Sequence, residues 1–197
     1  METYFMALMV LVSVVGLTFI VERGIVLRWN AVIPRAIETA LDSARGAAGR
    51  AAVHAACEQH PSPLARLLLA AEDHLDLPKD ENENALQSRA RQEVVQLERG
   101  LVILEIIVGI APLMGLVGTI YGMITLFGGL GEAGADNVAL AHGVSWILRF
   151  TMMGLLIAIP SIIAWSYYSK KVEMLAVEME NLCSEFLRRQ YHEAATK

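Results

Sequence analysis

The chain has 197 residues, of which 55% are hydrophobic and 19% are charged, and its formal net charge is −5. Soluble domains are less apolar and more charged than this, so the composition excludes a soluble enzyme domain and a disordered chain. Two cysteines without metal-ligand spacing argue against a disulfide-built module, and the acidic balance argues against nucleic-acid binding.

Three uncharged stretches, at 3–21, 106–131 and 150–169, are each about as long as a helix that crosses a bilayer. The first is not typical of a signal peptide, because it starts with Met-Glu-Thr-Tyr and lacks a basic n-region. We therefore predict an all-α integral membrane protein with three transmembrane helices and long cytoplasmic helical extensions.

The basic residues indicate the topology. Fifteen of the sixteen Lys and Arg lie in 23–99 or 170–197, and the segment between the second and third spans has none. The positive-inside rule then places both basic regions in the cytoplasm. The predicted segments are a first transmembrane helix at 1–28 with its N-terminus outside, a cytoplasmic helical region at 29–98, a second transmembrane helix at 99–128, an outside loop at 129–138, a third transmembrane helix at 139–168 and a cytoplasmic C-terminal helix at 169–197.

The cytoplasmic regions show helical patterns. Helices are expected over Val32–Cys57, over Leu64–Leu77 and from Ala85 without interruption into the membrane. The third carries an apolar stripe at Leu86, Ala90, Val94, Leu97, Leu101 and Leu104. A heptad stripe follows in the C-terminal region at Tyr168, Val172, Leu175, Met179, Leu182 and Phe186. Both stripes predict helices that pack against partner helices.

Small and kinking residues mark the second and third spans. Gly115, Gly118 and Gly122 let helix backbones approach closely, which matters because lipid supplies no hydrophobic drive between helices. Pro112 and Pro160 are tolerated where neighbouring helices satisfy the freed carbonyls. We assign these five residues to helix packing.

Two threonines are placed near mid-depth, Thr119 on the second span and Thr151 on the third. Each hydroxyl could simply bond to the carbonyl four residues earlier in its own helix. Their matching depth on antiparallel neighbours favours a shared polar ring instead. No carboxylate lies at this depth, so the chain can solvate a proton carrier but cannot be one.

The sequence at 111–123, APLMGLVGTIYGM, resembles the second-span signature of the MotA/TolQ/ExbB proton-channel family, in its ExbB/TolQ branch. The sequence at 151–160, TMMGLLIAIP, is similar to the third-span signature, and the Glu22-Arg23 pair is also typical. The resemblance implies a homopentamer in the bacterial inner membrane, with a periplasmic N-terminus and a cytoplasmic C-terminus. It also implies that Thr119 and Thr151 line a proton pathway.

The same resemblance implies partners. The pentamer would surround an ExbD/TolR-like single-span subunit that carries a protonatable aspartate, and membrane lipids would surround the whole. Proton flow would drive a motion that reaches a TonB- or Pal-type periplasmic protein. Nucleic acid is not an expected partner.

Two charges near the spans are candidates for function. Glu105 is expected at the inner interface, either at the pore mouth or paired with an arginine such as Arg99. Arg149 lies inside the third span and could snorkel toward Glu132 or Asp136, pair with a partner subunit, or contact a lipid phosphate. Trp146 stands where the ExbB-like pattern commonly has a glutamate.

Three functions were weighed. A proton-conducting stator subunit of an ExbB/TolQ-type motor is the favoured interpretation. A non-conducting membrane scaffold, in which the threonines merely pack, is the alternative. An enzyme is disfavoured because no nucleophile–base set, metal cluster or phosphate loop is present, and no cofactor or metal is expected.

Overall fold

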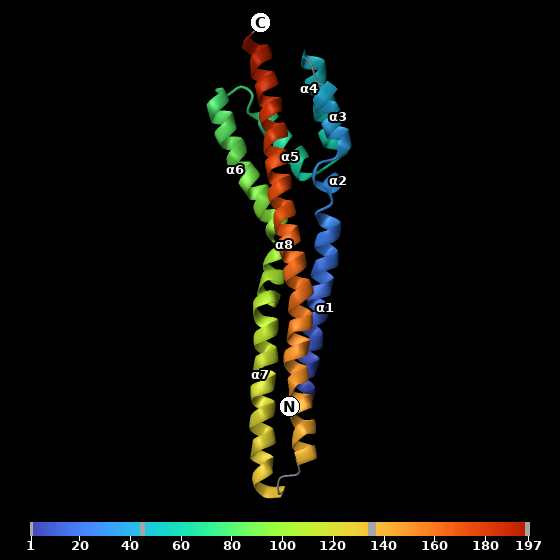
Figure 1. Cartoon of the computed structure of the whole chain (residues 1–197). Helices are drawn as coiled ribbons and strands as arrows, with labels where there is room; N and C mark the ends of the chain where they lie inside the picture. The colour runs from blue at the N-terminus through green and yellow to red at the C-terminus, as the bar shows by residue number, and fades with distance from the viewer. Residues whose placement is uncertain (1, 44–45, 134–136, 196–197) are drawn as a thin grey trace. The chain divides into compact units, whose positions relative to one another are not determined.

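A computed structural model of the chain describes residues 2–43, 46–133 and 137–195, and all regular structure in that part is α-helical (Figure 1). The helices are α1 (Glu2–Val26), α2 (Trp29–Val32), α3 (Arg35–Ser43), α4 (Gly46–Gln59), α5 (Pro63–Asp73), α6 (Lys79–Glu98), α7 (Leu101–Ala133) and α8 (Asn137–Ala195). The predicted all-α class is confirmed.

The chain divides into two compact units. The membrane unit comprises Met1–Arg23 and Gly100–Tyr167, and the second unit comprises Gly24–Arg99 and Tyr168–Lys197. Stretches long and apolar enough to cross a membrane occur at Tyr4–Val26 in α1, Leu101–Gly128 in α7 and within Leu140–His192 in α8. These three helices correspond to the three predicted spans.

The helices of the second unit have bounds that differ from the predicted ranges. The expected helix over Val32–Cys57 is wrong: α3 begins after Pro34, and α4 is a separate helix. Ser62 caps α5 by accepting a hydrogen bond from the backbone N–H of Ala65 at 3.1 Å, and Pro63 stands in the first turn. The helix expected over Leu64–Leu77 therefore starts one residue earlier, and it ends at Asp73.

The prediction of one helix from Ala85 into the membrane is also wrong. Helix α6 begins earlier, at Lys79 after Pro78, and it ends at Glu98, while Arg99 and Gly100 form a turn before α7. A Cβ atom at Gly100 would collide with the side chain of Arg23 in the membrane unit. Glycine also has a low helix propensity, so this position both permits the close approach and favours the break.

The C-terminal stripe is confirmed by burial in the second unit. Val172, Leu175, Met179 and Phe186 are each at most 2% exposed, and Tyr168 and Leu182 are half-buried. Helix α8 is also tied to α3 by Arg189, which donates to the carbonyl of Leu41 at 2.6 Å.

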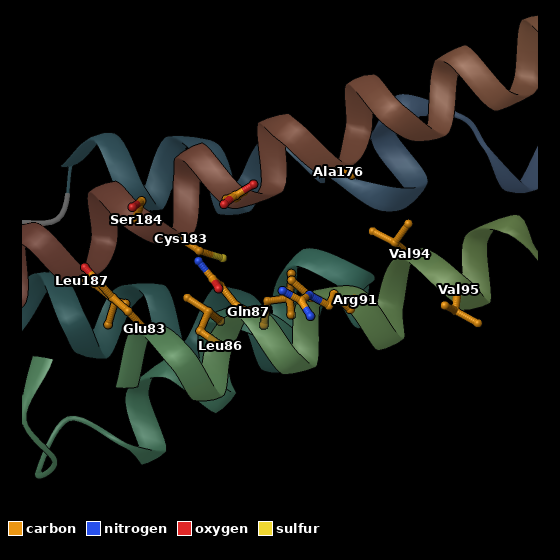
Figure 2. Close-up of a pocket in the computed structure, with 13 residues that line it drawn as sticks. Glu83, Leu86, Gln87, Arg91, Val94, Val95, Ala176, Cys183, Ser184 and Leu187 are labelled. Carbon is orange, nitrogen blue, oxygen red and sulfur yellow. The ribbon is translucent and has the colours of Figure 1, made fainter. Parts of the chain in front are cut away.

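The stripe that begins on α6 and continues into α7 is only partly covered. Leu97, Leu101 and Leu104 are buried, whereas Leu86, Ala90 and Val94 are half-buried. These three line a groove of about 670 Å³ between α6 and α8, which the side chains in Figure 2 outline. Cys183 and Leu187 of α8 border the same groove. The α6 stripe thus faces α8 but does not close on it.

Candidate functional site

Helices α7 and α8 of the membrane unit approach each other most closely at two glycines. A Cβ atom on Gly115 would lie 2.8 Å from the carbonyl oxygen of Phe150 and 3.1 Å from Cα of Thr151. One on Gly154 would lie 2.6 Å from the carbonyl oxygen of Ala111. Because backbone atoms occupy that space, any side chain larger than hydrogen at these positions would push the helices apart.

The predicted packing glycines have different surroundings. Gly118 lies against Phe5 and Phe150, and Gly122 lies against Ile147. The closest backbone approach therefore involves one glycine from each helix, Gly115 and Gly154, and not the GxxxG pair on α7. Pro112 and Pro160 both lie inside helices that continue through them.

Helix α1 covers one side of the α7–α8 pair. Phe5 of α1 stacks edge-to-face on Phe150 of α8, with ring centroids 5.6 Å apart. Further along α1, Gly16 lies within 4 Å, measured from its added Cβ, of Ile107 of α7 and Ser161 of α8. These contacts define which residues of α7 and α8 face α1.

The two threonines lie on the side away from α1. At about 100° per residue, Thr119 is rotated by about 100° from Gly118, and Thr151 by about 100° from Phe150, which both face α1. Because α7 and α8 are antiparallel, these two rotations carry the threonines to the same side of the pair. Thr119 is one turn from Gly115, and Cα of Thr151 lies beside Gly115. The threonines are therefore within about one helical turn of each other in depth.

The two hydroxyl groups differ in their hydrogen bonds. The Thr119 hydroxyl donates to the carbonyl of Leu116 at 2.7 Å, three residues earlier in its own helix. Thr125 and Ser161 bond to their own helices in the same manner. Thr151 is half-buried, and within the described chain its hydroxyl has no hydrogen-bond partner. The sequence allowed each threonine hydroxyl to bond to the carbonyl four residues earlier in its own helix. Thr119 makes such a bond, but with the carbonyl three residues earlier.

Glu105 lies exposed near the start of α7, fourteen residues before Thr119. That spacing corresponds to about 21 Å along a helix, so this carboxylate cannot reach the threonines. Glu22 at the end of α1 forms an ion pair with Arg23 at 2.6 Å. Along α7 and α8, no acidic residue lies within ten residues of Thr119 or Thr151 in the sequence.

Arg149 is exposed on α8, and its guanidinium carbon lies 4.8 Å from the centroid of the Trp146 ring. This cation–π contact was not predicted. The side chains of Glu132 and Asp136, toward which snorkelling was expected, lie outside the described residues.

An ion pair with a buried carboxylate in the second unit was not predicted. Glu93 of α6 is 1% exposed, and Arg66 of α5 donates to both of its carboxylate oxygens, at 2.9 and 2.5 Å. This bidentate bond raises the pKa of Arg66. The only sequence signal is that Glu93 lies four residues before the buried Leu97, on the same helix face.

A second missed cluster joins α4 to α5. His54 Nδ1 lies 2.8 Å from Glu72 Oε2, and His54 Nε2 lies 3.6 Å from Glu58 Oε1. Arg50 lies 3.8 Å from the other oxygen of Glu72. The hydrogen bond and charge of Glu72 raise the pKa of His54 above its usual range. In the part of the chain that was searched, no group of His, Cys, Asp and Glu could hold a metal ion.

These features define a multi-pass helical membrane protein. Its helices α7 and α8 pack closely at two glycines, and two threonine hydroxyls lie on the side of this pair that faces away from α1. Residues 59–181, more than half of the chain, match the sequence profile of the MotA/TolQ/ExbB proton channel family, and the chain belongs to this family. The matched region starts at the end of α4 and does not include α1.

Several curated relatives agree with this membership. The biopolymer transport protein ExbB of Aquifex aeolicus is 31% identical over 120 residues, which is 60% of this chain and 80% of the relative. ExbB of Xanthomonas campestris pv. campestris is 35% identical over 91 residues, 45% of this chain and 35% of the relative. The Tol-Pal system protein TolQ of Pseudomonas aeruginosa is 32% identical over 112 residues, 55% of this chain and 48% of the relative. The match thus spans less than half of the latter two proteins.

Proposed function

We propose that this chain is a proton-conducting stator subunit of an ExbB/TolQ-type motor in the bacterial inner membrane, with its N-terminus in the periplasm and its C-terminus in the cytoplasm. Five copies would surround a single-span ExbD/TolR-like partner that supplies a protonatable aspartate. The protein acts as an energy-coupling channel and not as an enzyme.

One observation carries this proposal: Thr119 and Thr151 lie on the same side of the α7–α8 pair, within about one turn of each other in depth. That side faces away from α1, so a ring of copies that turned it inward would enclose a lumen lined with hydroxyls. A charged carboxylate is costly in an apolar lumen unless donors solvate it. The threonines supply those donors on helices α7 and α8, which have no acidic residue within ten residues of either threonine.

The hydrogen bonds suggest different roles for the two hydroxyls. Thr151, which has no partner in the described chain, is ready to donate to a charged aspartate. Thr119 already donates to Leu116, but its oxygen can still accept a hydrogen bond from a protonated aspartate. Together they would stabilise both protonation states of the carrier, as proton transfer along the lumen requires.

Proton flow through this assembly would energise periplasmic or outer-membrane machinery through a TonB- or Pal-type protein. The names of the relatives favour such a system, since they describe biopolymer transport and Tol-Pal proteins. Membrane lipids would cover the apolar surface that a ring leaves exposed.

A non-conducting scaffold remains the alternative, and one observation favours it. The Thr119 hydroxyl is engaged by its own helix, as expected for a threonine that only packs. In a scaffold, removing the hydroxyl would have little effect.

Valine and serine variants distinguish the two functions. Valine nearly keeps the shape of threonine but lacks the hydroxyl, so Thr151→Val and Thr119→Val should slow proton-driven growth or transport at least tenfold while membrane levels stay normal, which corresponds to losing about one charge-assisted hydrogen bond. Serine variants should keep more activity than valine variants.

Thr125→Val is the matched control. Thr125 is on the same helix, and its hydroxyl also bonds to backbone carbonyls of that helix, but it lies more than a turn beyond Thr119. This variant should retain wild-type activity. Wild-type activity of the Thr119→Val/Thr151→Val double variant at normal membrane levels would favour the scaffold.

A further inference from the structure

Each of the two glycines at the closest approach of α7 and α8 is followed by a leucine. Leu116 follows Gly115, and Leu155 follows Gly154. One residue along a helix is a rotation of about 100°, so each leucine stands beside the contact and not in it. The two leucines are 50% and 46% exposed, respectively.

Both leucines lie on the side of the helix pair that carries the threonines. From the contact glycine of its own helix, each leucine is rotated by about 100°. The threonine is rotated in the same sense, by about 40° on α7 and about 60° on α8. Because the helices are antiparallel, these rotations turn all four side chains away from α1, to the side that we propose faces the lumen.

The contacts between the helices set the levels of these residues. Gly118 lies against Phe150, and each of them is next to a threonine in the sequence, so the two threonines lie at nearly the same level. Leu116 is three residues before one threonine, and Leu155 is four residues after the other. Both leucines therefore lie about 5 Å from the threonines in the same direction along the antiparallel pair. In the proposed topology this is the cytoplasmic direction.

Beyond the leucines this side of the pair remains apolar. Residues 106–118 of α7 and 152–160 of α8 include no charged, hydroxyl or amide side chain. The next polar residue on α8, Ser161, is buried beside Gly16 of α1 and donates to the carbonyl of Ile157 at 2.8 Å. The walls that the helices contribute are thus apolar for about 20 Å on α7 and about 14 Å on α8, counted from the threonines.

A proton crosses such a stretch only along a chain of water molecules or on a group that can hold it. The two apolar segments have no titratable side chain. Apolar constrictions exclude water by dewetting, and this closes the remaining route. In a ring, the two leucines of every copy would form the first apolar layer beside the hydroxyls.

We propose that Leu116 and Leu155 form a seal on the cytoplasmic side of the threonines, which excludes water from the lumen and so lets protons cross only when the partner helix moves. This inference rests on the proposed function, because it takes the threonine side as the lumen. The leucines determine what may pass and do not hold the proton themselves.

Proton leak across inner-membrane vesicles tests the seal. The vesicles come from host cells whose chromosomal gene carries the change, so that all partner subunits are present. The decay of an imposed pH gradient is followed with a pH-sensitive dye. We expect Leu116→Ser and Leu155→Ser to speed this decay about fivefold, since each serine offers water in the lumen about one hydrogen bond.

Leu156→Ser is the matched control. Leu156 is 61% exposed and follows Leu155, but it is rotated by about 200° from Gly154 and so points away from the proposed lumen. Vesicles with this variant should keep the wild-type decay rate. Leu116→Met should keep it too, because methionine is apolar and of similar volume.

Decay at the wild-type rate in both serine variants, at normal membrane levels, would overturn the seal and show that the leucines only pack against lipid or a neighbouring copy. An equal leak in Leu156→Ser would also overturn it, because any polar substitution in α8 would then perturb the membrane. If the serine variants do not accumulate, Leu116→Ala and Leu155→Ala take their place. They widen the passage and should leak more than the wild type, and a wild-type rate in both would contradict the seal.

Leak and driven activity together separate this inference from the proposed function. Loss of driven activity in the threonine-to-valine variants without a leak in the serine variants would leave conduction standing and remove only the seal. Full driven activity in the double valine variant with a leak in Leu116→Ser would support a sealed passage but remove the role of the threonines. Full driven activity without a leak would overturn both.

Discussion

The hydroxyl groups of the membrane helices differ in their hydrogen bonds according to the atoms that surround them. Thr119, Thr125 and Ser161 each satisfy their donor within their own helix, whereas Thr151 does not. The sequence identified both mid-depth threonines but could not distinguish them. Which carbonyl a hydroxyl reaches depends on its rotamer and on the packing of α7 against α8, and neither can be derived from residue order.

Glu105 is a further residue whose role can be measured. Changing it to Gln removes a charge about 21 Å from the threonines, so it should reduce proton-driven activity only moderately, by about two- to fivefold through weaker local attraction of protons. Growth or transport rates at normal membrane levels are the measurement. Complete loss of activity with intact assembly would show that Glu105 is an essential proton relay.

His54 should make the contact between α4 and α5 sensitive to pH. Glu72, by its hydrogen bond and charge, raises the pKa of His54 in the folded state. The contribution of this pair to stability is therefore fully present below the unfolded pKa of about 6.5 and is lost as pH rises through the raised folded value.

Hydrogen exchange of α4 amides should accordingly increase as pH rises through that window, after correction for the intrinsic rate. His54→Gln should remove this extra pH dependence. Exchange in the variant that follows the wild-type profile would contradict the assignment.

The sequence predicts which helices exist in this chain better than it predicts where each helix begins and ends. The three membrane helices follow from uncharged length, and the heptad stripe of the C-terminal region is buried as expected. The break at Arg99–Gly100 was not predicted, because the apolar stripe continues across it and the Arg23 side chain that packs against Gly100 comes from a distant part of the sequence. The bidentate Arg66–Glu93 pair was missed for the same reason: its partners are 27 residues apart.

The helix pair α7–α8 should depend on its glycines. Gly154→Ala would place a methyl group 2.6 Å from the carbonyl oxygen of Ala111. We expect the free energy of unfolding to fall by about 1–3 kcal/mol, as overpacking usually produces, or the fraction of assembled protein to fall. Thermal unfolding in detergent measures it.

Gly109→Ala is the control for this change, since an added Cβ there has no atom of a neighbouring helix within 4 Å. It should be neutral or slightly stabilising, because alanine favours a helix. Equal stability of the two variants would mean that the close contact at Gly154 does not matter for the α7–α8 pair.

The membrane helices expose many apolar side chains, which lipid or other subunits must cover. Leu113, Val117, Ile120 and Ile124 of α7 are each more than half exposed. Lipid can cover such residues, but the half-exposed threonine face requires a polar environment. Assembly into a ring satisfies both needs.

We therefore expect a pentamer in native mass spectrometry of the detergent-solubilised protein. Gly109→Ala should preserve the pentamer, whereas Gly154→Ala should reduce its fraction. A monomer or dimer as the only species of the wild type would argue against the ring.

The hydrogen bond from Thr119 to Leu116 also has a kinetic consequence. Breaking such a bond costs about 1 kcal/mol, so the hydroxyl would point elsewhere about one sixth of the time. Side-chain rotations take picoseconds to nanoseconds, whereas lid- or domain-scale motions take microseconds or longer. The hydroxyl would therefore reorient many times during each movement of a partner helix. The turnover rate of such a motor would therefore be set by that helix and not by the Thr119 hydroxyl.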